Sequence, residues 1–282
     1  MDIYEGAQAP ADIRLYEELR WPEVAAATAA QMPVILPLGA TEQHGSHLPF
    51  GTDTFQGIEV ARRAVLALRA QDVPLVLGPA IQYGPRQFLS ESPRDFPGTI
   101  ALSHDLLQRL IDEVCRELVR AGFRRIYLLM ANAETDPVMQ LAAKELVETT
   151  EADVVTLNWL VGAAPDYRAM RRSARPQGHA GEGETARMLA IAPHLVRLDR
   201  ATSYHPDVPP PAAHGDALPY LGGGVGRYRL PEAAFAGFDD GIWGDPANGT
   251  AEDGHRHLDV FAGWVARVIA ADSRLAGHAA RA

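Results

Sequence analysis

The chain of 282 residues contains a single cysteine, Cys115. One cysteine excludes an internal disulfide and any metal cluster built from cysteine ligands. Its surroundings, LLQRLIDEVCRELVRAGF, have the spacing of apolar residues that is typical of an amphipathic helix. We therefore expect Cys115 to be a small core residue.

Long apolar runs and an excess of positive charge are also missing. No run approaches the roughly 20 apolar residues that span a bilayer, and the acidic start, MDIYEGAQAPADIRLYEELRWPE, does not resemble a signal peptide. The 26 Lys+Arg and 36 Asp+Glu residues give a net charge of −10. This balance argues against binding to nucleic acid or to an anionic membrane surface. We expect a cytoplasmic protein that binds neither.

The composition, 47% hydrophobic and 22% charged, is that of a globular protein. Strand-like and helix-like segments alternate along it. Strands are expected at 33–39, 73–83, 124–132 and 153–160, and helices at 53–70, at 104–121, from Asp136-Pro137 onwards and at 251–272. Repeated β-then-α units predict an α/β fold with three α/β/α layers and a mainly parallel sheet, whose ligands lie at the carboxyl ends of the strands.

No linker divides the chain, so we expect one domain over 1–282. Residues 1–31 are interpreted as an N-terminal extension. The stretch 203–250 is rich in proline and glycine and is expected to be a long loop excursion.

The loop after the first predicted strand, GATEQHGSHLPFGTDT, carries three good metal ligands. Glu42 and His44 are two residues apart, which places both side chains on one side of an extended backbone. Asp53 stands where the next helix should begin. A carboxylate–imidazole–carboxylate set suits Zn²⁺, Mn²⁺ or Fe²⁺ better than Ca²⁺. The alternative is a solvated polar loop with a capping aspartate.

The string LPLGATEQHGSHLPFGTD resembles the signature of the creatininase (creatinine amidohydrolase) family. Further matches follow in order to the C-terminus: YGPRQFLSESPRDFPGTIALS, GFRRIYLLMANAETD, GHAGEGETARMLAIAP and GIWGDPANGTAEDG. The resemblance implies an α/β fold, assembly as a homohexamer and a metal site at the strand ends. It also implies hydrolysis of C–N bonds in small, often cyclic, amides.

The resemblance places Glu42, His44 and Asp53 at the first three ligand positions of the family. The usual fourth ligand, a histidine after the third strand, is replaced here by Asn132, and Glu134 matches the extra carboxylate ligand of creatininase itself. One site would consist of His44, Asp53 and Glu134, a set adequate for Zn²⁺ or Mn²⁺. The other, Glu42, Asp53 and Asn132, offers only oxygen donors. We therefore expect one tightly bound ion and a second that is weak or absent.

In the GHAGEGETARML segment, His179 matches a family histidine near the active site, which implies a role as proton donor or acceptor. Glu184 is expected near the start of the following helix, where it either orients His179 or a metal ligand, or merely favours the positive helix end.

Four other residues have open interpretations. His47 beside the ligand loop could bond substrate or backbone. Trp159, at the end of the fourth strand, could pack against a planar ligand or belong to the core. Arg86 and Arg94 could contact an anionic substrate, although exposed arginines are usually just solvated.

The leading hypothesis is a metal-dependent hydrolase that acts on a C–N bond of a small-molecule substrate. Two alternatives remain open. One is a catalytically impaired relative that binds a small ligand, favoured by Asn132, and the other is a hydrolase that opens a lactone or a cyclic diketone.

Overall fold

A computed structural model of the protein describes residues 13–86, 96–175, 177–205 and 232–279. Within them, the main sheet has four strands in the order β2-β1-β5-β6. All three pairings between neighbouring strands are parallel. The strands are β1 (Val34–Leu38), β2 (Val76–Leu77), β5 (Arg125–Met130) and β6 (Asp153–Asn158). The predicted α/β fold with a mainly parallel sheet is confirmed.

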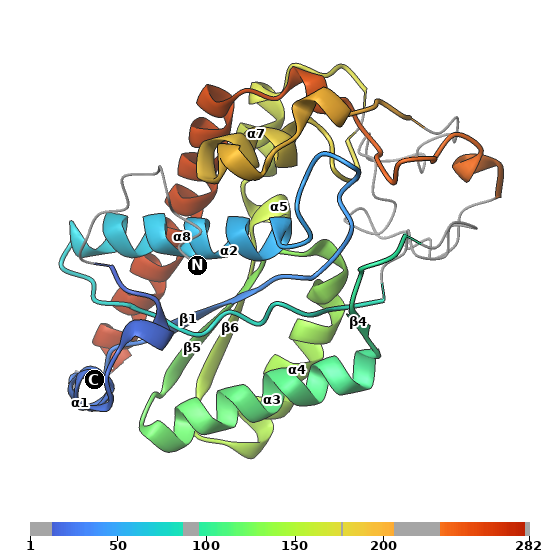
Figure 1. Ribbon diagram of the computed structural model, residues 1–282. Helices are drawn as coiled ribbons and strands as arrows, with labels where there is room; N and C mark the ends of the chain where they lie inside the picture. Colours follow the sequence, from blue (N-terminus) through green and yellow to red (C-terminus); the bar gives the residue numbers. More distant parts are fainter. Residues whose placement is uncertain (1–12, 87–95, 176, 206–231, 280–282) are drawn as a thin grey trace.

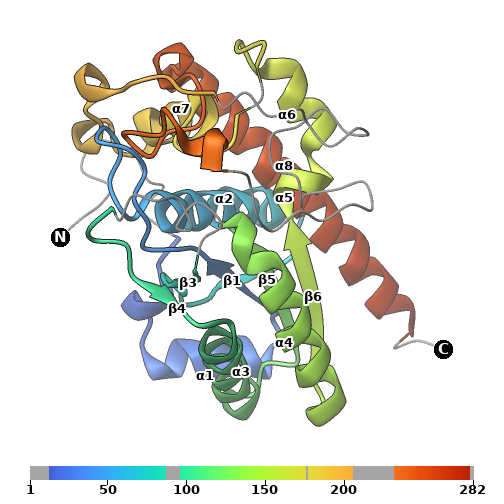
Figure 2. The same cartoon turned by 90° about the vertical axis from the view of Figure 1, so that its right-hand side faces the viewer.

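Helices cover both faces of this sheet, which gives the three expected layers (Figures 1 and 2). On one side lie α2 (Thr52–Arg69), α7 (Glu182–Ile191) and α8 (Ala251–Ala279). On the other lie α3 (His104–Ala121) and α4 (Asp136–Thr149), with α1 (Trp21–Ala29) packed beside α3. The remaining short elements are α5 (Trp159–Gly162), α6 (Ala164–Met170) and 3-10 turns at Tyr16–Glu18, Ala133–Thr135, Pro193–Leu195, Leu198–Arg200, Glu232–Phe235 and Pro246–Asn248.

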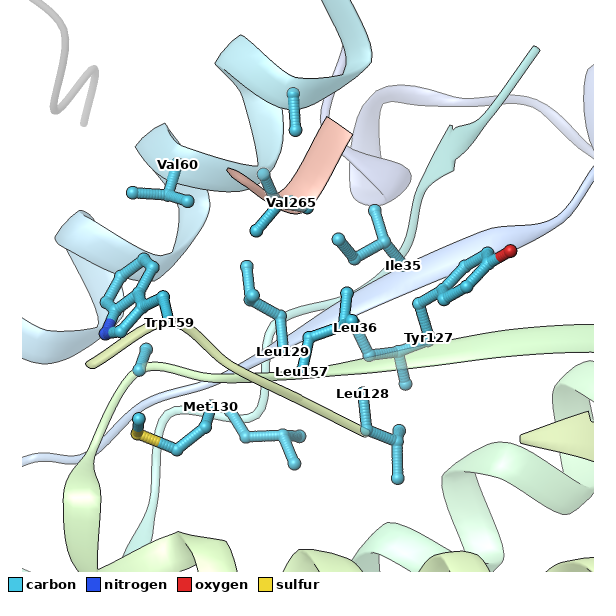
Figure 3. Close-up of a cluster of buried hydrophobic side chains, with 14 of the residues drawn as sticks. Ile35, Leu36, Val60, Tyr127, Leu128, Leu129, Met130, Leu157, Trp159 and Val265 are labelled. Carbon is cyan, nitrogen blue, oxygen red and sulfur yellow. The ribbon is translucent and has the colours of Figure 1, made fainter. Parts of the chain in front are cut away.

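The core lies between the sheet and its helices. All five residues of β1 are buried, as expected for a parallel strand covered on both faces. Figure 3 shows Ile35 and Leu129 among apolar side chains that include Val60 of α2 and Val265 of α8. Cys115 is fully buried, which confirms its predicted place in the core. No helix of the described residues is both long and apolar enough to cross a membrane.

The predicted strand at 73–83 is broken into pieces. Only Val76–Leu77 pairs with β1, after which Ile81 forms an isolated bridge to Leu38. Gly84–Pro85 (β3) pairs instead with Ala101–Leu102 (β4). A proline at position 79 interrupts the run, because it has no N–H to donate to a ladder.

The observed helix boundaries match the predicted ones closely for one helix and less closely for another. The helix at 104–121 has the predicted bounds and ends at Gly122, which adopts the left-handed conformation with φ 112°. The last helix runs beyond 272, to Ala279. The predicted single domain over 1–282 stays a prediction. Residues 1–12 of the N-terminal extension and 206–231 of the loop excursion lie outside the described residues.

Gly39, at the carboxyl end of β1, allows the first turn of α2 to come very close. A Cβ atom at Gly39 would lie 2.4 Å from Thr54 Oγ1 and 2.7 Å from Thr54 Cα. Only glycine tolerates such an approach. Because of this contact, the loop that follows β1 and the N-terminal turn of α2 meet at the same edge of the sheet.

Candidate metal centre

The loop after β1 buries the side chains of Glu42 and His44, which are 4% and 1% exposed. The Nδ1 atom of His44 lies 3.0 Å from the backbone oxygen of Glu42. Since a carbonyl oxygen only accepts, Nδ1 donates this bond, and Nε2 is the ring atom that can release its proton and offer a lone pair. The Nε2 atom has no hydrogen-bond partner among the described residues. A buried histidine held this way is prepared to be a metal ligand.

Two carboxylates face this nitrogen. Asp53, in the first turn of α2, places Oδ1 3.4 Å from His44 Nε2, and Glu184, in the first turn of α7, places Oε2 at 3.9 Å. Glu184 Oε2 also accepts a hydrogen bond from the backbone N–H of Ala180 at 2.6 Å. Ligand atoms of His44, Asp53 and Glu184 all lie within 4.8 Å of one another. Residues far apart in the sequence thus form a set of metal-ligand type.

His179 is a second histidine in contact with His44. Its backbone pairs with Trp243 through bonds of 3.0 and 2.8 Å, and its Nε2 donates to the backbone oxygen of Gln43 at 2.6 Å. Nε2 is also 3.8 Å from Glu42 Oε1, and the rings of His179 and His44 are 4.3 Å apart. A second set of potential ligand atoms is therefore Glu42, His44 and His179.

The residue after His179 has an unusual backbone. Ala180 adopts a φ of 50°, in the left-handed region that a non-glycine residue rarely occupies, and its side chain is fully buried. Such a conformation persists only where the surroundings hold it. The strand-like pairing of His179 with Trp243 and the bond from Ala180 N–H to Glu184 supply that support.

Asn132, which follows β5, faces the two carboxylates with its amide nitrogen. Nδ2 donates to Asp53 Oδ2 at 2.9 Å and to Glu42 Oε2 at 3.2 Å, whereas Oδ1 accepts from the backbone N–H of Glu134 at 3.1 Å. The opposite orientation would set oxygen against two carboxylates and an amide nitrogen against an N–H donor. The network therefore defines which way the amide points. In this arrangement the Asn132 oxygen is used as a turn cap.

Glu134, predicted beside His44 and Asp53, lines the same pocket but belongs to neither set of potential ligand atoms. In the described residues the place beside His44 and Asp53 is taken by Glu184. The pocket itself is formed by residues from both halves of the chain: Glu42, Asp53, Gln56, Ala131, Asn132, Ala133, Glu134, Trp159, Leu160, Gly178, His179, Glu184 and Arg187.

Burial and mutual interaction shift the pKa values of the carboxylates and the imidazole in the two ligand sets. Burial raises the pKa of Glu42 well above its ordinary value, and burial likewise raises that of Glu184. Burial also opposes ionisation of Asp53, but His44 and the Asn132 amide hold its pKa below the usual range. For His44, burial lowers the pKa, but Asp53, Glu184 and Glu42 together raise it to about 10. These shifts show that the four side chains lie close enough, and are buried deeply enough, to change one another's ionisation.

Two further buried imidazoles, those of His179 and His47, have lowered pKa values. Burial, together with the charge of His44, lowers the pKa of His179 to about 3. Burial also lowers that of His47 to about 4. His47 Nε2 is 2.9 Å from Thr185 Oγ1, so this histidine ties the ligand loop to α7.

Sequence reasoning missed two residues of the pocket wall, Gln56 and Arg187. Both stand one helical turn beyond a ligand candidate, three residues after Asp53 and Glu184, and this spacing was the available signal. Of the arginines considered for substrate contact, Arg86 is exposed and Arg94 lies outside the described residues. Trp159 is 2% exposed, stacks on Phe261 at 5.3 Å and also lines the pocket.

Known proteins of one family are similar to most of this chain. The sequence model of the creatininase family, described as creatinine amidohydrolase, matches residues 17–269. The chain belongs to the creatininase family. It is 33% identical to the creatinine amidohydrolase of Pseudomonas putida over 210 residues, which cover 69% of this chain and 78% of the relative. It is 28% identical to the mycofactocin precursor peptide peptidase of Mycobacterium tuberculosis over 253 residues, which cover 86% and 87%.

Solved creatininase structures have the same fold. A manganese form of creatininase superposes with a TM-score of 0.73 at 27% identity, covering 92% of this chain and 98% of that one. A glutamate-to-glutamine creatininase mutant of Zn–Zn type gives a TM-score of 0.72 at 27% identity, covering 92% and 97%. Creatininase-family proteins with this fold therefore occur in manganese and zinc forms.

Proposed function

We propose that this creatininase-family protein is a metal-dependent hydrolase that cleaves a C–N bond, an amide or cyclic amide, in a small molecule. The observation that carries the proposal is the Nε2 atom of His44. It is buried, has no hydrogen-bond partner among the described residues and lies 3.4 Å from a carboxylate oxygen of Asp53 and 3.9 Å from one of Glu184.

The residues fit a divalent metal ion. One imidazole nitrogen with two carboxylates is a donor set for Zn²⁺ or Mn²⁺, and His44, Asp53 and Glu184 would hold the ion. Glu42 would complete the site from the side of His179. The predicted set with Glu134 in place of Glu184 stays a prediction, because Glu134 also lines the pocket. When bound, the ion supplies Lewis acidity that polarises an amide carbonyl and activates water at neutral pH.

The residues around the metal-ligand set would position the ligands, exchange protons and line the pocket. Asn132 holds the carboxylates of Glu42 and Asp53 at defined positions through its two amide hydrogens. His179 is oriented by the backbone oxygen of Gln43 and lies next to Glu42, where it can exchange a proton with the reacting water or the leaving nitrogen. The ring of Trp159 gives the pocket an apolar wall.

Metal analysis of the purified protein tests this proposal. Protein expressed with added Zn²⁺ or Mn²⁺ should retain about one ion per chain after dialysis, and the loaded form should hydrolyse at least one member of a panel of linear and cyclic amides. A protein without bound transition metal would instead support the impaired relative that only binds a ligand. Hydrolysis of lactones or cyclic diketones but of no amide would support the third hypothesis.

We also propose that the protein acts in the cytoplasm as a homo-oligomer, with the hexamer expected from its family. The buried, free thiol of Cys115 is compatible with a reducing compartment. Exposed Phe50, Tyr83 and Ile100 offer apolar surface for subunit contacts. Light scattering coupled to size-exclusion chromatography tests the assembly, and a mass of one chain would contradict it.

A further inference from the structure

Arg187 is a buried cation in the wall of the same pocket. It lies on α7, one turn after Glu184, and is only 4% exposed. Its guanidinium carbon is 5.8 Å from the ring centre of Tyr167 and 5.4 Å from that of Phe261, so two aromatic rings pack against it. A charged side chain at this depth is rare unless it is paired.

No carboxylate of the described residues forms an ion pair with Arg187. Its Nε donates to Gln56 Oε1, but its Nη1 is buried with no hydrogen-bond partner in the described part of the chain. Gln56 Nε2 is buried and without a partner in the same way. Arg187 and Gln56 both line the pocket, and each has a buried donor atom without an acceptor among the described residues. Burying such donors unsatisfied costs free energy, about 1–3 kcal/mol each and more for a charged group.

The surroundings do not neutralise the guanidinium. His257 of α8 is fully buried. Burial, together with the positive charge of Arg187, lowers its pKa to about 3, so it stays neutral. The rings of Tyr167 and Phe261 pack against the guanidinium. Glu184 is attracted to Arg187, as the lowering effect of Arg187 on its pKa shows, but Glu184 is bonded to Ala180 N–H and faces His44.

We propose that Arg187 and Gln56 form a subsite for a carboxylate of the substrate, so that the enzyme prefers amides bearing a carboxylate within a few bonds of the scissile carbon. This inference rests on the proposed function, because the same pocket contains the metal-ligand set. The carboxylate would accept hydrogen bonds from Nη1 of Arg187 and Nε2 of Gln56, and a charged bond of this kind is worth more than a neutral one. Arg187 lies only one helical turn from the metal-ligand candidate Glu184, so we expect the carboxylate and the scissile carbon of the substrate to be only a few bonds apart.

Binding of matched probes tests the subsite without requiring turnover. The probes are malonamate, succinamate and glutaramate, each compared by calorimetry with its uncharged diamide on the Zn²⁺-loaded, full-length protein. We expect at least one ω-amido carboxylate to bind 10-fold or more tightly than its diamide. In Arg187→Met, which keeps the length of an apolar stem, the ratio should fall to about 1, and in Arg187→Lys it should be partly retained.

The matched control is Arg120→Met, on α3 at the opposite face of the sheet, where the exposed arginine pairs with Glu117. It should leave the ratio unchanged. A preference that persists in Arg187→Met would mean that the carboxylate binds elsewhere, and equal binding of acid and diamide by the wild type would also overturn the proposal. Metal content is measured on every sample. Loss of metal in the wild type would refute the proposed function, whereas a normal metal content without carboxylate preference would refute only the subsite.

Discussion

The side-chain amide of Asn132 donates a hydrogen bond of 2.9 Å to the carboxylate of Asp53. Its second amide hydrogen faces Glu42, so the amide nitrogen stands between two carboxylates that the family resemblance assigns to metal binding. Because its oxygen accepts a hydrogen bond from the backbone N–H of Glu134, the atom that Asn132 directs at the carboxylates is an amide nitrogen, which does not bind a metal ion. This arrangement explains in atomic terms why a second ion is expected to be weak or absent.

Replacing Asn132 by histidine should create the second ion site. An imidazole nitrogen at this position would add a ligand beside Glu42 and Asp53. The number of bound ions per chain, measured by mass spectrometry, should therefore rise from about one toward two. Asn132→Leu is the control, because it removes the amide without adding a ligand. An unchanged ion count in Asn132→His would contradict the role given to Asn132.

Metal affinity should show whether Glu184 or Glu134 is the third ligand of the first ion. If Glu184 is a ligand, Glu184→Gln should weaken metal affinity by about 10-fold or more, since a neutral amide replaces a charged donor. Glu134→Gln should have a smaller effect. Competition with a chromophoric chelator measures both. The reverse order would restore Glu134 as the ligand that the family resemblance predicts.

His179 should affect the rate more than the metal. Removing a group that exchanges a proton typically lowers kcat by about 10²–10⁴-fold, so His179→Ala should lose activity on this scale toward whichever amide the panel identifies. Its metal content should stay near that of the wild type. If the metal is lost as well, His179 is a ligand together with Glu42 and His44, as its distances permit.

Gly39→Ala should destabilise the fold. The new methyl group would overlap the backbone of Thr54, and such overpacking typically costs about 1–3 kcal/mol. Gly263→Ala in α8 is the control, since the nearest atom, Arg267 Nη1, is 3.5 Å from the added Cβ, and helix propensity favours alanine by about 1 kcal/mol. Urea unfolding of the two variants measures the difference. Equal stabilities would contradict the close approach of β1 and α2.

His257 should make the protein sensitive to acid. Burial lowers its pKa from 6.5 to about 3, so the unfolded chain binds the proton more readily than the folded one. Above pH 6.5 His257 is neutral in both the folded and the unfolded chain, and the free energy of unfolding is not reduced by its protonation. The free energy of unfolding decreases as the pH falls from 6.5 toward 3, by up to about 1.4 kcal/mol per unit. In His257→Leu this part of the slope should disappear, as followed by urea unfolding at pH 7, 6, 5 and 4.

Much of the fold could be predicted because the relevant signals are local. The apolar run at Val34–Leu38 and the helix that ends at Gly122 depend on short stretches of sequence. The strand at 73–83 was overestimated, since the apolar pattern does not show which backbone groups find a ladder partner. Glu184 was predicted at a helix start, but its distance to His44 depends on how α7 packs over α2.

The amino-acid sequence alone determined the order of strands and helices, the family, and the small group of residues around which a metal site could form. Tertiary structure decided which of these side chains meet. It directed the nitrogen of Asn132 toward Asp53 and brought Glu184 beside His44. It also left Arg187 buried without an ion-pair partner among the residues that the structure describes. The reason is physical: periodicity and motifs report the chemistry and the secondary structure of each segment. The distances between segments depend on how helices pack across the sheet, and that packing depends on the whole core.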